Sequence, residues 1–155
     1  MEPSCVLVLG IGNTLLQDDG AGVAVAKFLQ NHPDLPPGVL CLDAGTLSFS
    51  LFSSLMNSDA LIVVDAAVIA GAPVQVFVGP DMDTLLLSGR RNAHQVGIAD
   101  LLSATRLLGK TYNKQALVAL QSRSLDWGEE LTPPVAQNIP HAAEVVLSLI
   151  RCWCG

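Results

Sequence analysis

The chain has 155 residues, of which 50% are hydrophobic, 14% are charged and 5% are aromatic, and its formal net charge is −6. A chain this long and this apolar is not disordered by composition, and we expect residues 1–155 to form a single domain. The sequence has no block or stripe of Lys and Arg. It therefore lacks the cationic surface that nucleic-acid binding needs.

Short apolar runs alternate with helical patterns in the first half of the chain. The predicted strands are Cys5–Leu9, Val39–Leu42 and Ala60–Val64. One helix is predicted from Asp19 to about Asn31, and a second has its apolar face formed by Leu47, Leu51, Leu55 and Met56. Alternation of strands and helices in this order predicts a doubly wound parallel sheet.

The second half of the chain completes this sheet. About eight residues separate the third strand from the next apolar run, Val74–Val78. A parallel crossover needs about a dozen residues, so this fourth strand should run antiparallel. The remaining predicted elements are a loop over Pro80–Asn92, a helix from Val96 to about Leu108, a strand at Ala116–Leu120 and a helix from Thr132 to about Arg151.

Pro140 should kink or interrupt the last helix. The predicted fold class is α/β: a single domain with a mostly parallel five-stranded sheet, helices on both faces and one antiparallel strand.

The four cysteines indicate a reducing compartment. Cys5 and Cys41 lie in apolar, strand-like runs, where a cysteine is usually a small buried hydrophobic residue. Cys152 and Cys154 flank Trp153 near the C-terminus and are expected to be free thiols. We therefore expect a cytoplasmic protein.

The apolar stretch Ala60–Gly79 is long enough to be compared with a membrane span. It contains Asp65, Gly71 and Pro73 and is rich in Val and Ala. Two buried strands joined by a turn explain this pattern better than a spanning helix of about 20 residues. The sequence therefore predicts no membrane insertion.

Three polar residues follow predicted strands at positions where side chains can carry chemistry. Asp19 follows the first strand, Asp65 closes the third, and His94 lies in the loop after the fourth. Ligands of doubly wound sheets bind beyond the carboxyl ends of the strands. Asp19 could instead cap the first helix, and His94 could cap the third helix or stack within its loop. Asp65 is harder to explain as a structural residue, because a buried unpaired carboxylate is costly.

Taken together, these residues form a set of two carboxylates and one imidazole. Such a set suits a first-row divalent metal ion whose shell keeps open positions.

Other kinds of active site fit the sequence less well. The Gly-rich segment 10–15 resembles a dinucleotide-binding loop, and Asp43 stands where a ribose-binding acid would be. However, Leu15 replaces the third glycine, and Asp18 and Asp19 would repel a pyrophosphate. The sequence contains neither Gly-x-Ser-x-Gly nor His-Glu-x-x-His, so the usual serine-hydrolase and zinc-protease motifs are absent.

Five segments in chain order resemble the motifs of the nickel–iron hydrogenase maturation endopeptidases. They are 10–22 (GIGNTLLQDDGAG), 43–46 (DAGT), 61–66 (LIVVDA), 94–102 (HQVGIADLL) and 121–133 (QSRSLDWGEELTP). The resemblance extends from about Val6 to Leu149, nearly the whole chain. Five motifs in order are far more specific than any one of them.

This resemblance implies an endopeptidase that removes the C-terminal peptide from a hydrogenase large-subunit precursor after nickel insertion. The family cuts after the basic residue that follows the last nickel-binding cysteine pair. Its metal-binding positions correspond here to Asp19, Asp65 and His94, and an acid important for cleavage corresponds to Asp43. Asp19 is Asp where some members have Glu, which shortens its reach by one methylene.

The resemblance also implies that nickel arrives with the precursor, although other divalent metals can substitute in the free enzyme. Nickel bound by the three side chains would then dock the scissile bond beside the enzyme. Lewis-acid activation of water or of the carbonyl is the alternative. Asp43 would be a general base, or would position the bond or the basic residue. Two rival functions are a non-enzymatic metal-binding chaperone of the precursor and a dinucleotide-binding protein.

Overall fold

The computed structural model describes residues 6–45, 49–82 and 93–154, without the side chains of residues 49, 50 and 93–99. The elements in chain order are β1 (Val6–Gly10), the 3-10 turn η1 (Gln17–Gly20), α1 (Ala21–Gln30), β2 (Val39–Asp43), α2 (Phe49–Met56), β3 (Ala60–Ala67), β4 (Val74–Val78), α4 (Ala93–Leu107), β5 (Lys114–Gln121) and α5 (Pro133–Cys154). Cys5, Leu47 and most of the predicted Pro80–Asn92 loop lie outside the described residues.

The strands form one five-stranded sheet in the order β2-β1-β3-β5-β4. The pairs β1–β2, β1–β3 and β3–β5 are parallel, and β4 pairs antiparallel with β5. The predicted mostly parallel α/β fold and its one antiparallel strand are therefore confirmed.

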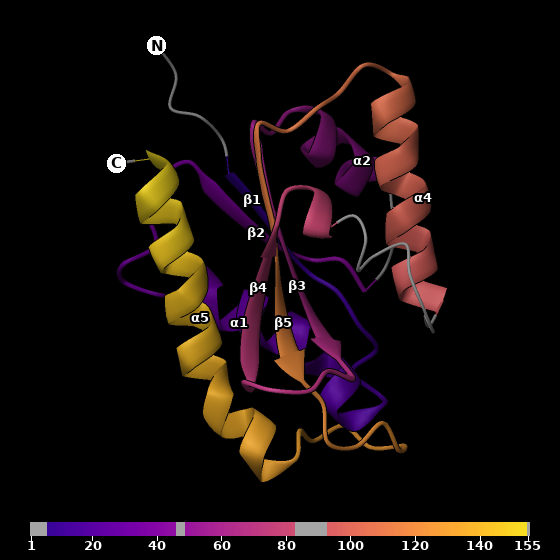
Figure 1. Ribbon diagram of the computed structural model, residues 1–155, viewed down its shortest axis with the longest axis vertical. Helices are drawn as coiled ribbons and strands as arrows, with labels where there is room; N and C mark the ends of the chain where they lie inside the picture. The colour runs from indigo at the N-terminus through magenta and orange to yellow at the C-terminus, as the bar shows by residue number, and fades with distance from the viewer. Residues whose placement is uncertain (1–5, 46–48, 83–92, 155) are drawn as a thin grey trace.

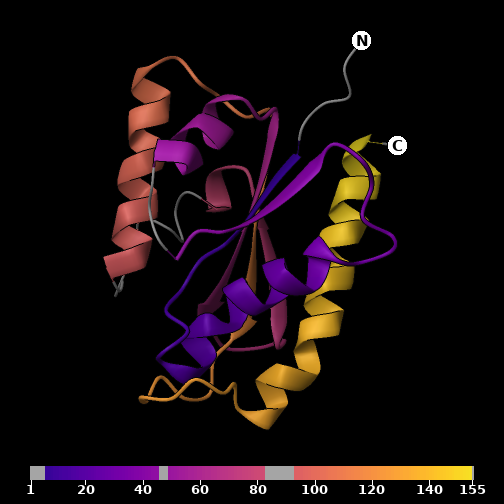
Figure 2. The ribbon, with the colours of Figure 1, turned by 180° about the vertical axis from the view of Figure 1, so that it is seen from behind.

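Helices cover both faces of this sheet (Figure 1), and Figure 2 shows the arrangement from behind. On one face, Val8, Ile62 and Val118 pack among α1 and α5. On the other face, Leu9, Val63 and Leu117 pack among residues of α2 and α4. Successive strand residues point to opposite faces, so strands covered on both sides need almost continuous apolar sequence.

Several predicted boundaries are wrong. β3 does not end before Asp65: it continues to Ala67 because β5 pairs with it through the register Ala67–Gln121. Residues 80–82 are helical instead of looped, and Met82 is fully buried.

The last helix, α5, also runs further than expected, to Cys154, and Pro140 does not interrupt it. Proline cannot donate the backbone bond at its position. Buried Ile139, Ala142 and Ala143 pack this part of α5 against the sheet, which offsets the loss.

The described thiols agree with the sequence predictions. Cys41 is buried and free, and burial raises its pKa to about 11. Cys152 and Cys154 are exposed free thiols. Within residues 6–45, 49–82 and 93–154, none of the helices combines the length and the apolar character that crossing a bilayer requires.

Candidate active site at the carboxyl ends of the parallel strands

The carboxyl ends of β1, β2 and β3 lie side by side and in register. Gly10, the last residue of β1, pairs with Asp43 of β2 and with Val64 of β3. The chain leaving β1 stays attached there, because the Ile11 amide donates to the Val64 carbonyl at 2.9 Å. Asp65 is therefore the first β3 residue beyond the end of β1.

Glycines allow the segment after β1 to fold tightly onto this edge. A Cβ atom at Gly10 would overlap the Gly22 carbonyl oxygen, and one at Gly22 would overlap the Val64 carbonyl oxygen. Gly12 has φ +134°, and a Cβ atom there would overlap the Asp19 carbonyl oxygen. The glycines of the first motif thus bring η1, and with it Asp19, against the strand ends.

Asp19 lies within η1 and is only 4% exposed. Its Oδ2 accepts a hydrogen bond from the Asn13 amide at 2.8 Å, and its own amide donates to the Leu16 carbonyl at 3.0 Å. The alternative that Asp19 caps the first helix is wrong: α1 begins at Ala21 after Gly20, without a side-chain cap. The turn instead holds one oxygen of a buried carboxylate.

Asp65 is 3% exposed and pairs with Ala119 of β5 in the sheet. The alternation along β3 places its side chain on the face of Leu61 and Val63, which α2 and α4 cover. Burying a carboxylate is costly. A second acid is therefore held at this edge of the sheet, next to the elements that carry Asp19: η1 itself packs against β3.

His94 is the second residue of α4, and its side chain lies outside the described part of the structure. In Figure 1, α4 runs beside the sheet, with its first turn toward the end at which β3 and β5 terminate. Among the side chains that the structure describes, no group of three His, Cys, Asp or Glu residues could hold a metal ion. The predicted metal set of Asp19, Asp65 and His94 therefore stays a prediction.

Asp43 is exposed at the end of β2. Its Oδ1 accepts a hydrogen bond from the Gly45 amide at 2.7 Å, which is an Asx turn. β1 separates β2 from β3, so the backbones of Asp43 and Asp65 are about 10 Å apart, two strand spacings. Asp43 therefore lies at the same edge of the sheet, two strands away from Asp65.

Asp18 is the residue that the sequence did not identify as part of the site. It is fully buried, and its Oδ2 accepts hydrogen bonds from the amides of Arg123 at 2.8 Å and Ser124 at 2.9 Å. Its Oδ1 accepts from the Thr132 amide at 2.8 Å, and the Thr132 hydroxyl lies 3.0 Å and 2.8 Å from its two oxygens.

Two effects act on the pKa of Asp18. Burial raises it, but together the hydrogen bonds from Thr132, Arg123 and Ser124 outweigh burial and leave the pKa below its usual value. The interaction thus favours the charged carboxylate. Nothing local in the sequence predicts it, because the partners lie more than 100 residues away in the chain.

Backbone hydrogen bonds also attach the segment 121–133 to η1 and to the residues just before it. The Gln17 amide donates to the Gly128 carbonyl at 2.8 Å, and the Gly128 amide donates to the Leu15 carbonyl at 2.9 Å. The segment also carries Trp127, which is 80% exposed. The first and last motifs of the sequence therefore form one surface at the carboxyl edge.

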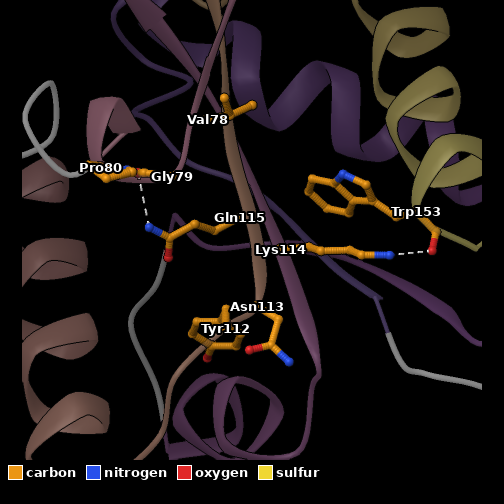
Figure 3. Close-up of a pocket in the computed structure, with 8 residues that line it drawn as sticks. All are labelled: Val78, Gly79, Pro80, Tyr112, Asn113, Lys114, Gln115 and Trp153. Atoms are coloured by element: carbon orange, nitrogen blue, oxygen red, sulfur yellow. Dashed lines mark hydrogen bonds between the residues drawn. The ribbon is translucent and has the colours of Figure 1, made fainter.

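A separate pocket of about 370 Å³ lies at the opposite, amino-terminal edge of the sheet (Figure 3). Trp153 and Tyr112 line it, Lys114 Nζ donates to the Trp153 carbonyl at 2.6 Å, and Gln115 Nε2 donates to the Gly79 carbonyl at 3.1 Å. Among the residues that the structure describes, its lining includes no Asp, Glu or His. The pocket therefore lacks the groups that the predicted chemistry needs.

Comparisons with known proteins identify the same family that the motifs resemble. The family model described as hydrogenase maturation protease matches residues 23–149. The hydrogenase 2 maturation protease of Escherichia coli K12 is 38% identical over 148 residues, covering 94% of this chain and 90% of that protein.

Solved structures point to the same family. The hydrogenase maturating endopeptidase HybD from E. coli has a TM-score of 0.85 at 37% identity, covering 95% of this chain and 92% of that one. The nickel–iron hydrogenase maturation protease HybD from Thermococcus kodakarensis has a TM-score of 0.77 at 26% identity, covering 94% and 98%.

Proposed function

The chain belongs to the hydrogenase maturation protease family and is a peptidase, and we propose that it removes the C-terminal peptide from a nickel-loaded large-subunit precursor of a nickel–iron hydrogenase. The observation that carries this proposal is the pair of buried acids, Asp19 and Asp65, at the carboxyl edge of the sheet. The family gives no support to the alternatives of a non-enzymatic chaperone or a dinucleotide-binding protein.

In this proposal, Asp19, Asp65 and His94 bind the nickel that the precursor carries. Two carboxylates that are 4% and 3% exposed favour a cation beside them, because a buried negative charge is costly unless it is compensated. Imidazole and carboxylate are both suitable ligands for first-row metals. Three ligands leave positions in the nickel shell for groups of the precursor.

Recognition of the precursor's nickel would place the scissile bond at the carboxyl edge of the sheet. Holding a reactant beside catalytic groups lowers the barrier by proximity alone. When bound, nickel also offers Lewis acidity toward water or the scissile carbonyl.

Asp43 is proposed to act in cleavage from the same edge. Its carboxylate is exposed and held by the Gly45 amide, so it is fixed in position and still accessible. An acid in this position suits either a general base for water or a partner for the basic residue before the cut. The exposed thiols of Cys152 and Cys154 are consistent with action in a reducing cytoplasm.

The test is the processing of nickel-loaded precursor by three variants, Asp19→Ala, Asp65→Ala and His94→Ala, followed by intact-mass measurement. Each variant should leave the precursor at full length. Circular dichroism should show each variant folded, which distinguishes loss of the site from loss of the fold. Normal processing by any two of the three would remove the proposed site.

A further inference from the structure

The Asp18 carboxylate is the point where the first and last motifs meet. It accepts hydrogen bonds from three backbone amides and one hydroxyl, all from the segment Arg123–Thr132. Its own amide donates back to the Ser124 carbonyl at 3.1 Å. One side chain of η1 thus organises a segment that is distant in sequence.

We propose that Asp18 is a positioning residue, which fixes the turn carrying Asp19 by tying it to the segment Arg123–Thr132. This inference rests on the proposed function, in which Asp19 is a ligand of the precursor's nickel. Asp18 itself is fully buried and directed at backbone amides, so it does not contact substrate.

The turn needs this attachment because its own conformation is strained. Gln17, one residue before Asp18, has φ +42°, which non-glycine residues seldom adopt. Such a conformation persists only where neighbouring structure determines it. The Gly128 backbone provides that support: it accepts a hydrogen bond from the Gln17 amide, and a Cβ atom at Gly128 would come within 3.2 Å of the Gln17 side chain.

A carboxylate is required because the donors approach both of its oxygens. The amides of Arg123 and Ser124 use Oδ2, and the amide of Thr132 uses Oδ1. In Asp18→Asn, one oxygen becomes an NH₂ group that can only donate. Whichever way the amide turns, at least one backbone donor then faces another donor and loses its partner.

The amide of Asn13 reports the consequence for Asp19. It donates to Asp19 Oδ2, so its exchange rate measures how firmly the Asp19 carboxylate is held. Amide hydrogen exchange by NMR in the free enzyme should show Asn13 exchanging about tenfold faster or more in Asp18→Asn than in the wild type. The affinity for Ni²⁺ alone should fall by about tenfold or more, as for other residues that hold metal ligands in place.

Tyr112→Phe is the matched control. It also removes a hydrogen bond from a partly buried side chain, from the Tyr112 hydroxyl to the Leu55 carbonyl at 2.6 Å, but at the opposite edge of the sheet. It should leave Asn13 exchange and Ni²⁺ affinity at their wild-type values. Equal Asn13 exchange in Asp18→Asn and Tyr112→Phe would overturn the proposal.

If Asp18→Asn does not fold, Thr132→Val replaces it, because that variant removes only the hydroxyl donor. It should speed Asn13 exchange in the same direction by a smaller factor, and unchanged exchange would also overturn the proposal. Because amide exchange requires no precursor, its result is independent of whether the enzyme processes a hydrogenase. In processing, Asp18→Asn should raise the KM for the nickel-loaded precursor, because a displaced Asp19 binds the precursor's nickel less tightly.

Discussion

Substitution of Gly12 by alanine should displace the turn that carries Asp19 and slow processing strongly, while the fold loses only part of its stability. Gly12 has φ +134°, and an added Cβ atom would overlap the Asp19 carbonyl oxygen. The backbone conformation alone costs about 1–3 kcal/mol for a residue with a side chain. Relief of the overlap requires η1 to move, and a displacement of about 1 Å at a catalytic group costs about a hundredfold in rate.

Gly109→Ala provides a control with similar backbone strain and no overlap. Gly109 has φ +85°, and no described atom outside its chain neighbours lies within 4 Å of the Cβ position. We expect a cost of about 1–2 kcal/mol, which lowers the melting temperature by about 5 °C in a chain of this length. Its processing rate should remain that of the wild type.

The two variants are compared by thermal unfolding and by the processing rate of nickel-loaded precursor, measured well below both melting temperatures. Gly12→Ala should melt no higher than Gly109→Ala and process about a hundredfold more slowly. If both variants process at the wild-type rate, the close contact between Gly12 and Asp19 has no role in the site.

Three further predictions concern Trp153 in the last helix, the partly buried Tyr112 and the exposed Asp43. Trp153→Ala should lower the free energy of unfolding by about 1–2 kcal/mol, because this half-buried ring packs on the core, and should leave processing unchanged. Lost activity at an unchanged melting temperature would instead give this end of the last helix a role in function. Burial raises the pKa of Tyr112 to about 12. The stability that the protonated phenol contributes is therefore complete below pH 10 and is lost as the pH rises through 12. Urea unfolding should show that the free energy of unfolding of Tyr112→Phe declines less over this pH range than that of the wild type. Asp43→Asn keeps an oxygen for the Gly45 amide, so the free energy of unfolding should change by less than about 0.5 kcal/mol. The cleavage rate should fall by a larger factor than the affinity for the precursor. Equal losses of affinity and of cleavage rate would argue against a role in the cleavage step.

The arrangement of the strands could be predicted because it follows from local sequence features. The short connection before Val74 fixed β4 as antiparallel, and the apolar periodicity located both faces of the sheet. The end of β3 could not be predicted in this way. A charged residue after four apolar ones suggests the end of a strand, but β3 continues because β5 pairs with it beyond the end of β1.

The candidate site was predicted in part for the same reason. Topology alone brings Asp19 and Asp65 to one edge, so their placement is predictable from strand ends, whereas the place of His94 in the site stays a prediction. Asp18 was not found, since its partners at Arg123, Ser124 and Thr132 become neighbours only after folding. For Asp43, the family resemblance predicts a role in cleavage, and the structure shows in addition that its side chain forms a turn with the Gly45 amide.

The source of the metal is the most direct test of the proposed function. Nickel-loaded and nickel-free precursors are each incubated with untreated enzyme and with chelator-dialysed enzyme, and the intact mass of the precursor is measured. We predict that both enzyme samples shorten the nickel-loaded precursor and that neither shortens the nickel-free one. Efficient cutting of the nickel-free precursor, or loss of cutting only after the enzyme is dialysed, would contradict recognition of nickel on the substrate.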